Sequence, residues 1–203
     1  RKEYRGRKNR VMALNGIGIV HLSFDNYDEA EKLFREALAE EKALDSPVGQ
    51  AMNWANIGAI FEEKQLYDSA FTYYRNSMEQ NRIARSQLGM GLCHIHFGRI
   101  HELQGQLDEA EQEYRQAYEI MGTISDTWHW LEACLAIGRI RLARNDFTGA
   151  KEYIDLAKES ANIFRKRMPC CTNTTARKGT SRRHCATTSS ARHIWTACAT
   201  NKS

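Results

Sequence analysis

The residues best suited to chemistry in this chain are its seven histidines and six cysteines. His94 and His96 are two residues apart, so on a helix they point in different directions. Cys93 and Cys134 each stand alone in a helical pattern, where cysteine usually behaves as a small hydrophobic residue. No histidine or cysteine pair has the spacing that places two metal ligands on one helical face. We therefore expect no metal site.

Two other local patterns could belong to an enzyme. Asn15-Gly16-Ile17-Gly18 matches part of a dinucleotide-binding fingerprint, but it lies inside a helical pattern and follows no strand. The acidic pair Glu62-Glu63 is typical of a solvated helix face. No nucleophile is accompanied by a base that would activate it. The sequence therefore predicts no catalytic residue, no cofactor and no enzymatic activity.

The charge of the chain is unevenly distributed. Residues 1–10 hold six basic side chains and one acid, and residues 169–203 hold six basic side chains and no acid. Between them, residues 11–168 carry 17 basic and 24 acidic side chains, a net charge of −7. A nucleic-acid-binding domain would carry a basic stripe on its folded face, so we expect no nucleic-acid partner for this segment. No apolar run approaches the roughly 20 residues that span a bilayer, so no membrane span is predicted.

A period of 40 residues runs through the sequence. Four glycines recur at this spacing, and an alanine follows each of them by twelve residues. A large residue comes four residues after each alanine, and a small one three residues further on. In order, these columns are Gly18, Gly58, Gly98 and Gly138; Ala30, Ala70, Ala110 and Ala150; Phe34, Tyr74, Tyr114 and Ile154; and Ala37, Ser77, Ala117 and Ala157.

Each period predicts two helices, because each contains two apolar stripes of helical spacing with a polar stretch between them. We expect eight helices from about residue 9 to about residue 166, with the small glycine and alanine columns allowing close approach and the aromatic column filling the gap. An Asp or Thr is expected to cap each second helix: Asp28, Asp68, Asp108 and Thr148. Turns are predicted near 25–28, 65–68, 105–108 and 145–148, and longer connections near 45–50, 85–90 and 123–128.

The columns resemble the tetratricopeptide repeat over residues 11–165. The second copy fits best, through Trp54, Ile57-Gly58, Phe61, Tyr67, Ala70 and Tyr74. The resemblance implies an all-α fold, an alpha-alpha superhelix of helical hairpins that binds a protein or peptide. Two features differ from the family pattern: the period exceeds the usual length of about 34 residues, and the proline that commonly closes the second helix is missing. HEAT repeats also run near 40 residues, but the glycine and alanine columns argue against them.

The resemblance also implies a ligand groove, because the first helix of each unit forms the inner wall in this family. The early part of the groove is apolar, and methionine suits adaptable binding surfaces. Arg99 and Arg139 occupy equivalent places one period apart, which favours a peptide with an apolar end and an acidic end. In the alternative, these arginines pair with Glu102 and Glu132 and bind nothing. The candidate groove residues are Met12, Asn15, Ile19, Met52, Asn56, Glu62, His96, Arg99, Glu132 and Arg139.

Two functions are open at this point. The first is a protein- or peptide-binding scaffold that forms the repeat region of a larger bacterial regulator, since units longer than the usual repeat resemble those of such regulators. The second is a structural segment that self-associates or packs on its own effector domain without an external ligand.

The expected organisation places the end of a preceding repeat in residues 1–10 and an aberrant tail in residues 169–203. The tail lacks a helical period and contains eight threonines, four cysteines and no acid. A shifted reading frame lets Cys171–Thr175 encode Leu-Tyr-Lys-Tyr-Tyr, and similar shifts restore other columns of a further repeat. We therefore expect the tail to be frame-shifted and disordered. The four intervening repeats are predicted at 11–50, 51–90, 91–130 and 131–168.

Overall fold

The computed structural model describes residues 2–167, and the prediction for the tail at 169–203 lies outside this part of the chain. Two compact units are present, Arg1–Ile163 and Phe164–Ser203. In the second unit only the last residues of the final helix are described.

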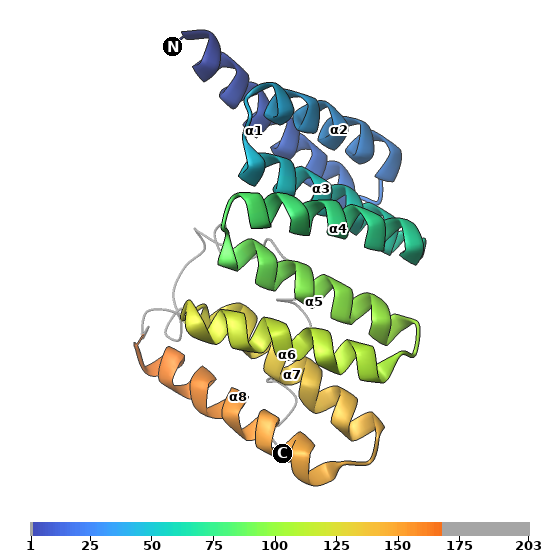
Figure 1. Ribbon diagram of the computed structural model, residues 1–203, viewed down its shortest axis with the longest axis vertical. Coiled ribbons are helices and arrows are strands. Elements are labelled where there is room, and N and C mark those ends of the chain that lie inside the picture. The colour runs from blue at the N-terminus through green and yellow to red at the C-terminus, as the bar shows by residue number, and fades with distance from the viewer. Residues whose placement is uncertain (1, 168–203) are drawn as a thin grey trace, which may run out of the picture. The chain divides into compact units, whose positions relative to one another are not determined.

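Eight helices follow one another in antiparallel succession (Figure 1), and residues 2–167 contain no strand. This confirms the predicted all-α superhelix of helical hairpins. The helices are α1 (Lys2–Ser23), α2 (Tyr27–Ala43), α3 (Pro47–Glu63), α4 (Tyr67–Ile83), α5 (Gln87–Leu103), α6 (Leu107–Thr123), α7 (Thr127–Ala143) and α8 (Phe147–Arg167).

The 40-residue period follows from the helix lengths. Each helix from α2 to α7 has 17 residues and is separated from the next by three residues, so one hairpin with its two connections takes 40. The longer connections predicted near 45–50, 85–90 and 123–128 were wrong, because those connections are as short as the others. The helices α3, α5 and α7 begin four residues before the expected repeat starts at 51, 91 and 131, and α1 continues through residues 2–10 without a break.

The same backbone structure makes every connection short. In the first one, the N–H of Asn26 donates to the carbonyl of His21 at 2.9 Å, and the N–H of Asp25 donates to that of Leu22 at 3.2 Å. This pattern closes a helix around a residue in the left-handed region, here Asp25 with φ 59°. The carbonyl of Asn26 then accepts from the N–H of Ala30 at 3.0 Å, so the residue that closes α1 also begins α2.

The predicted N-caps of the second helices were wrong by two residues. Asp28, Asp68 and Asp108 lie inside the first turn, where a carboxylate is favoured by the partial positive charge of the helix N-terminus. Thr148 is likewise the second residue of its helix. The actual cap positions of α2, α4 and α6 make no side-chain capping hydrogen bond. The first helices α3, α5 and α7 do have such bonds, from the side chains of Ser46, Ser86 and Asp126.

The glycine column gives the two helices of each hairpin room to pack. A Cβ atom added at Gly58 would lie 2.8 Å from the ring of Tyr74, and one at Gly98 would lie 2.9 Å from the ring of Tyr114. The alanine column is fully buried beside these rings, with Ala70 and Ala110 at 0% exposure. The expected close approach, with the aromatic column filling the gap, is therefore confirmed.

We predict opposite effects from the same substitution at two glycines. Gly58→Ala should destabilise the fold by on the order of 1–3 kcal/mol, because the new methyl group overpacks against the buried Tyr74 ring. Gly16→Ala is the matched control, since nothing lies within 4 Å of its Cβ position. It should stabilise the helix by about 0.5–1 kcal/mol. Urea unfolding followed by circular dichroism measures both, and a Gly58→Ala variant as stable as Gly16→Ala would contradict the assigned packing.

Candidate protein-binding groove

The groove expected from the sequence lies over the first helices α1, α3, α5 and α7. Helix α3 contacts α5 directly across the repeat boundary, whereas neither α2 and α4 nor α4 and α6 approach each other as closely. A curved stack brings its helices closest together on the concave side, so this contact favours the first helices as the inner side. The position of the groove stays a prediction.

A buried carboxylate organises the centre of this surface. The side chain of Glu62 is only 9% exposed, and its Oε2 accepts a hydrogen bond from the Tyr74 hydroxyl at 2.7 Å. Its Oε1 lies 3.4 Å from Nη1 of Arg99, which comes from the next repeat. The ring of His96 stacks on Tyr74 at 4.2 Å, with its Nδ1 3.7 Å from Glu62. Burial raises the pKa of Glu62, whereas the nearby His96 and the charge of Arg99 lower it. The lowering effects together are larger, so the net shift of the pKa is downward.

The same arrangement recurs one repeat later. Glu102 accepts a hydrogen bond from the Tyr114 hydroxyl at 3.0 Å and two from Arg139, at 2.6 and 2.7 Å. Burial raises the pKa of Glu102, and the paired guanidinium lowers it below its usual value. Each unit thus joins a glutamate, a tyrosine of the same hairpin and an arginine of the next one. We call these two sets the Glu62 unit and the Glu102 unit.

The corresponding positions at the N-terminal end of the groove are apolar. Leu22, Phe34 and Ala59 stand where the Glu62 unit has glutamate, tyrosine and arginine. The ring carries a hydroxyl only where a glutamate is present to accept its hydrogen bond. A buried hydroxyl without a partner would be costly, so the two columns are chemically matched. These columns therefore change from apolar residues in the first repeat to glutamate, tyrosine and arginine in the Glu62 and Glu102 units.

The predicted residues divide between these two parts. Met12, Ile19 and Met52 are 73%, 48% and 53% exposed, and Asn15 and Asn56 are half-buried. The structure brings Glu62, His96 and Arg99 together. Glu132, half-buried, contributes its negative charge to the surroundings of Arg99.

One expected pairing needs correction. Arg99 pairs with Glu62 and not with Glu102 or Glu132, while Arg139 pairs with Glu102. In each pair the glutamate lies on the first helix of one repeat and the arginine on the first helix of the next repeat. The two residues are therefore 37 apart in the sequence and are not neighbours on one helix. The hydroxyl groups of Tyr74 and Tyr114 were not anticipated as part of the site. Their signal was a glutamate twelve residues before a tyrosine in the two middle repeats.

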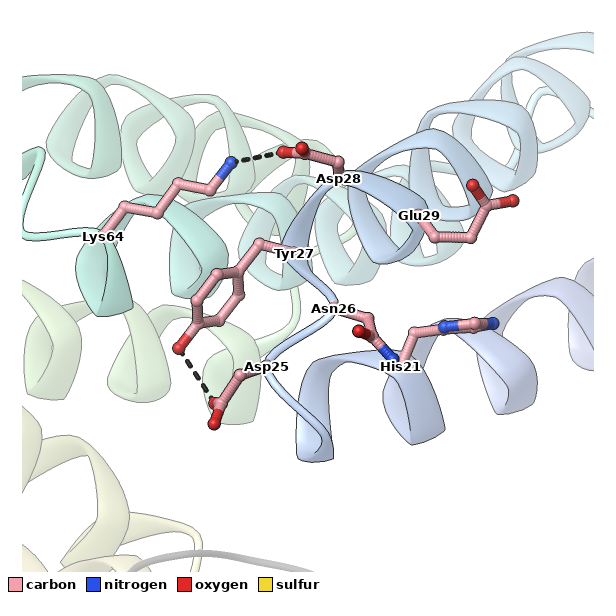
Figure 2. Close-up of a pocket in the computed structure, with 7 residues that line it drawn as sticks. All are labelled: His21, Asp25, Asn26, Tyr27, Asp28, Glu29 and Lys64. Carbon is pink, nitrogen blue, oxygen red and sulfur yellow. Dashed lines mark hydrogen bonds and ion pairs between the residues drawn. The ribbon is translucent and has the colours of Figure 1, made fainter.

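A separate depression of about 810 Å³ lies at the turn between α1 and α2 (Figure 2). Its walls include an ion pair between Lys64 and Asp28 at 2.9 Å and a hydrogen bond from the Tyr27 hydroxyl to Asp25 at 3.0 Å. None of the ten predicted groove residues lines it. It is an open surface feature whose charged groups already have partners.

The cysteines of the described region are buried. Cys93 lies within hydrogen-bonding distance of Ser77 at 3.5 Å and Asn81 at 3.7 Å. Burial raises the pKa of Cys134 to about 12, so its thiol is protonated at neutral pH. Residues 2–167 contain no group of three or more histidine, cysteine or carboxylate side chains that could hold a metal ion. Among the described helices, none is long and apolar enough to cross a membrane.

Comparison with known proteins identifies the family. Two sequence models, both of the tetratricopeptide repeat, match residues 10–44 and 49–122. Together with the solenoid fold, these matches show that the chain belongs to the tetratricopeptide repeat family. No curated protein matches the chain in sequence.

Solved structures show the same fold. The apo form of RapI aligns with a TM-score of 0.70 at 12% identity, over 77% of this chain and 44% of its own. BtubC (BKLC) from P. vanneervenii aligns at 0.66 and 16% identity, over 87% and 71%. Aspartyl phosphate phosphatase F from Bacillus subtilis aligns at 0.58 and 12% identity, over 84% and 52%. This chain therefore spans about half the length of RapI and of the phosphatase.

We predict that Glu62 makes stability depend on pH. Its pKa is lower in the folded chain than the ordinary value of 4.5, so the unfolded chain takes up a proton first as the pH falls. The stabilisation is complete above about pH 5 and is lost as the pH falls through the folded pKa. Glu62→Gln should therefore lower stability at neutral pH and flatten the acid limb of a plot of unfolding free energy against pH. Glu63→Gln, at the exposed neighbouring position, should keep that limb, and equal curves for the two variants would contradict the assignment.

Proposed function

We propose that the chain is a protein-interaction scaffold whose partner lies along the first helices, with an apolar segment over α1 and α3. Tetratricopeptide repeats generally serve as non-catalytic scaffolds, which supports the absence of enzymatic activity. The observation that carries the proposal is the exposure of Met12, Ile19 and Met52, which occupy the expected groove positions of α1 and α3. Solvated methionine side chains adapt to the shape of a bound apolar surface.

The polar half of the groove constrains the chemistry of the partner. Arg99 and Arg139 are already neutralised by Glu62 and Glu102 at close range. An acidic group of a ligand would have to compete with these internal carboxylates, which the protein has already positioned. Glu132 adds a further negative charge beside Arg99. We therefore no longer expect the ligand to have an acidic end. We propose that the groove binds an apolar or amphipathic peptide segment and does not select for acidic residues.

The host of this array is proposed to be a larger bacterial regulator. The fold likeness to RapI and to aspartyl phosphate phosphatase F supports this context. The apolar groove is compatible with reading a peptide or partner protein in a signalling pathway. This part of the proposal concerns the whole protein, whereas the groove proposal concerns residues 2–167.

The groove is tested by selecting binders from a phage-displayed peptide library against the full chain. Selected peptides should be rich in large apolar residues, because the exposed row offers apolar contact area. Met12→Gln combined with Met52→Gln should weaken the best peptide by about tenfold or more in isothermal titration, equivalent to about 1.4 kcal/mol.

The control for this experiment is Ile83→Gln. Ile83 is 57% exposed, like Met52, but it lies at the end of the second helix α4. This variant should bind with unchanged affinity. Equal weakening by both changes, or by neither, would place the binding surface outside the first helices.

A further inference from the structure

The N-terminal turn of α7 carries an exposed tryptophan. Trp128 is 45% exposed, and its counterparts in the two preceding first helices, Val48 and Leu88, are 54% and 42% exposed. Helices α3 and α5 have neighbours on both sides, so exposure belongs to the position itself and does not arise at an end of the array. An aliphatic side chain suffices for the fold in those two repeats. The indole of Trp128 is therefore available as a binding surface.

Glu132 lies one turn further along the same face of α7. Residues four apart are neighbours on a helix surface, so the carboxylate and the indole are close to each other. Glu132 stands one or more full periods after Met12 and Met52, at an expected groove position. Within residues 2–167, the side chains of Trp128 and Glu132 make no hydrogen bond, ion pair or ring contact with another residue.

The charges around Glu132 do not neutralise it. Burial lowers the pKa of Arg99, whereas the charges of Glu62 and Glu132 raise it, with a net shift upward. The Glu132 carboxylate therefore acts toward α5 and not toward the end of the array. Arg99 is already paired with Glu62 at 3.4 Å. Arg139 is paired with Glu102 at 2.6 Å, so these three glutamates and two arginines leave one net negative charge.

We propose that Trp128 and Glu132 bind a lysine or arginine side chain of the peptide that occupies the groove. A cation stacks favourably on the face of an indole, and the neighbouring carboxylate supplies the opposite charge. The body of the chain favours the same partner, because residues 11–168 carry a net charge of −7 and attract a basic peptide. This inference rests on the proposed groove function and adds to it the charge and position of one ligand residue.

The test compares peptides selected from a phage-displayed library by the wild-type chain and by a variant with Trp128→Leu and Glu132→Gln. Wild-type peptides should combine a run of large apolar residues with a lysine or arginine to one side of it. The variant should select the same apolar run without enrichment in basic residues. Leucine already occupies the equivalent position at Leu88, so circular dichroism should show an unchanged fold.

Isothermal titration with the best wild-type peptide then assigns the effect to one contact. Glu132→Gln should weaken this peptide by about fivefold to tenfold, and replacing the basic residue of the peptide with norleucine should weaken it by a similar factor. The two changes together should cost little more than either alone, because both remove the same contact. Glu119→Gln removes an exposed carboxylate from the second helix α6 and should leave the affinity within about twofold.

The outcomes separate this inference from the groove proposal. Selected apolar peptides without a basic residue, or basic enrichment that persists in the variant, would overturn the inference and leave the groove proposal standing. Additive effects of Glu132→Gln and of norleucine would overturn it as well, since the cation would then bind elsewhere. Failure to select any apolar peptide would overturn the groove proposal, and the inference with it.

Discussion

The contact between a glycine of one helix and the large side chain that lies on it in the next, an aromatic ring in the first three repeats, sets the spacing of each hairpin. At Gly58 the ring of Tyr74 occupies the space that any side chain would need, and the same holds at Gly98 and Tyr114. This close contact lets the aromatic ring bury completely while its far edge reaches the inner surface. The hydroxyl of that ring then meets the groove carboxylate, so the packing contact also positions the polar site.

The connections transmit this geometry from one hairpin to the next. Because each helix ends and the next begins within three residues, consecutive repeats are related by nearly the same step. That step brings a glutamate on one first helix beside an arginine 37 residues later, at Arg99 and again at Arg139. The glutamate of each pair is also hydrogen-bonded by a tyrosine, which offsets part of the cost of desolvating the carboxylate.

Much of the fold was determined by the sequence alone, because close packing admits few residue types at a repeated contact. The glycine, alanine and aromatic columns predicted the hairpins and the residues buried between them. The N-caps and connection lengths were not predictable, since the cap positions of α2, α4 and α6, such as Leu66, make no side-chain capping bond. The partner of Arg99 was decided only by the tertiary structure. Sequence patterns indicate which face of a helix a residue occupies, but the step between repeats determines that Glu62, and not Glu102 or Glu132, reaches its guanidinium.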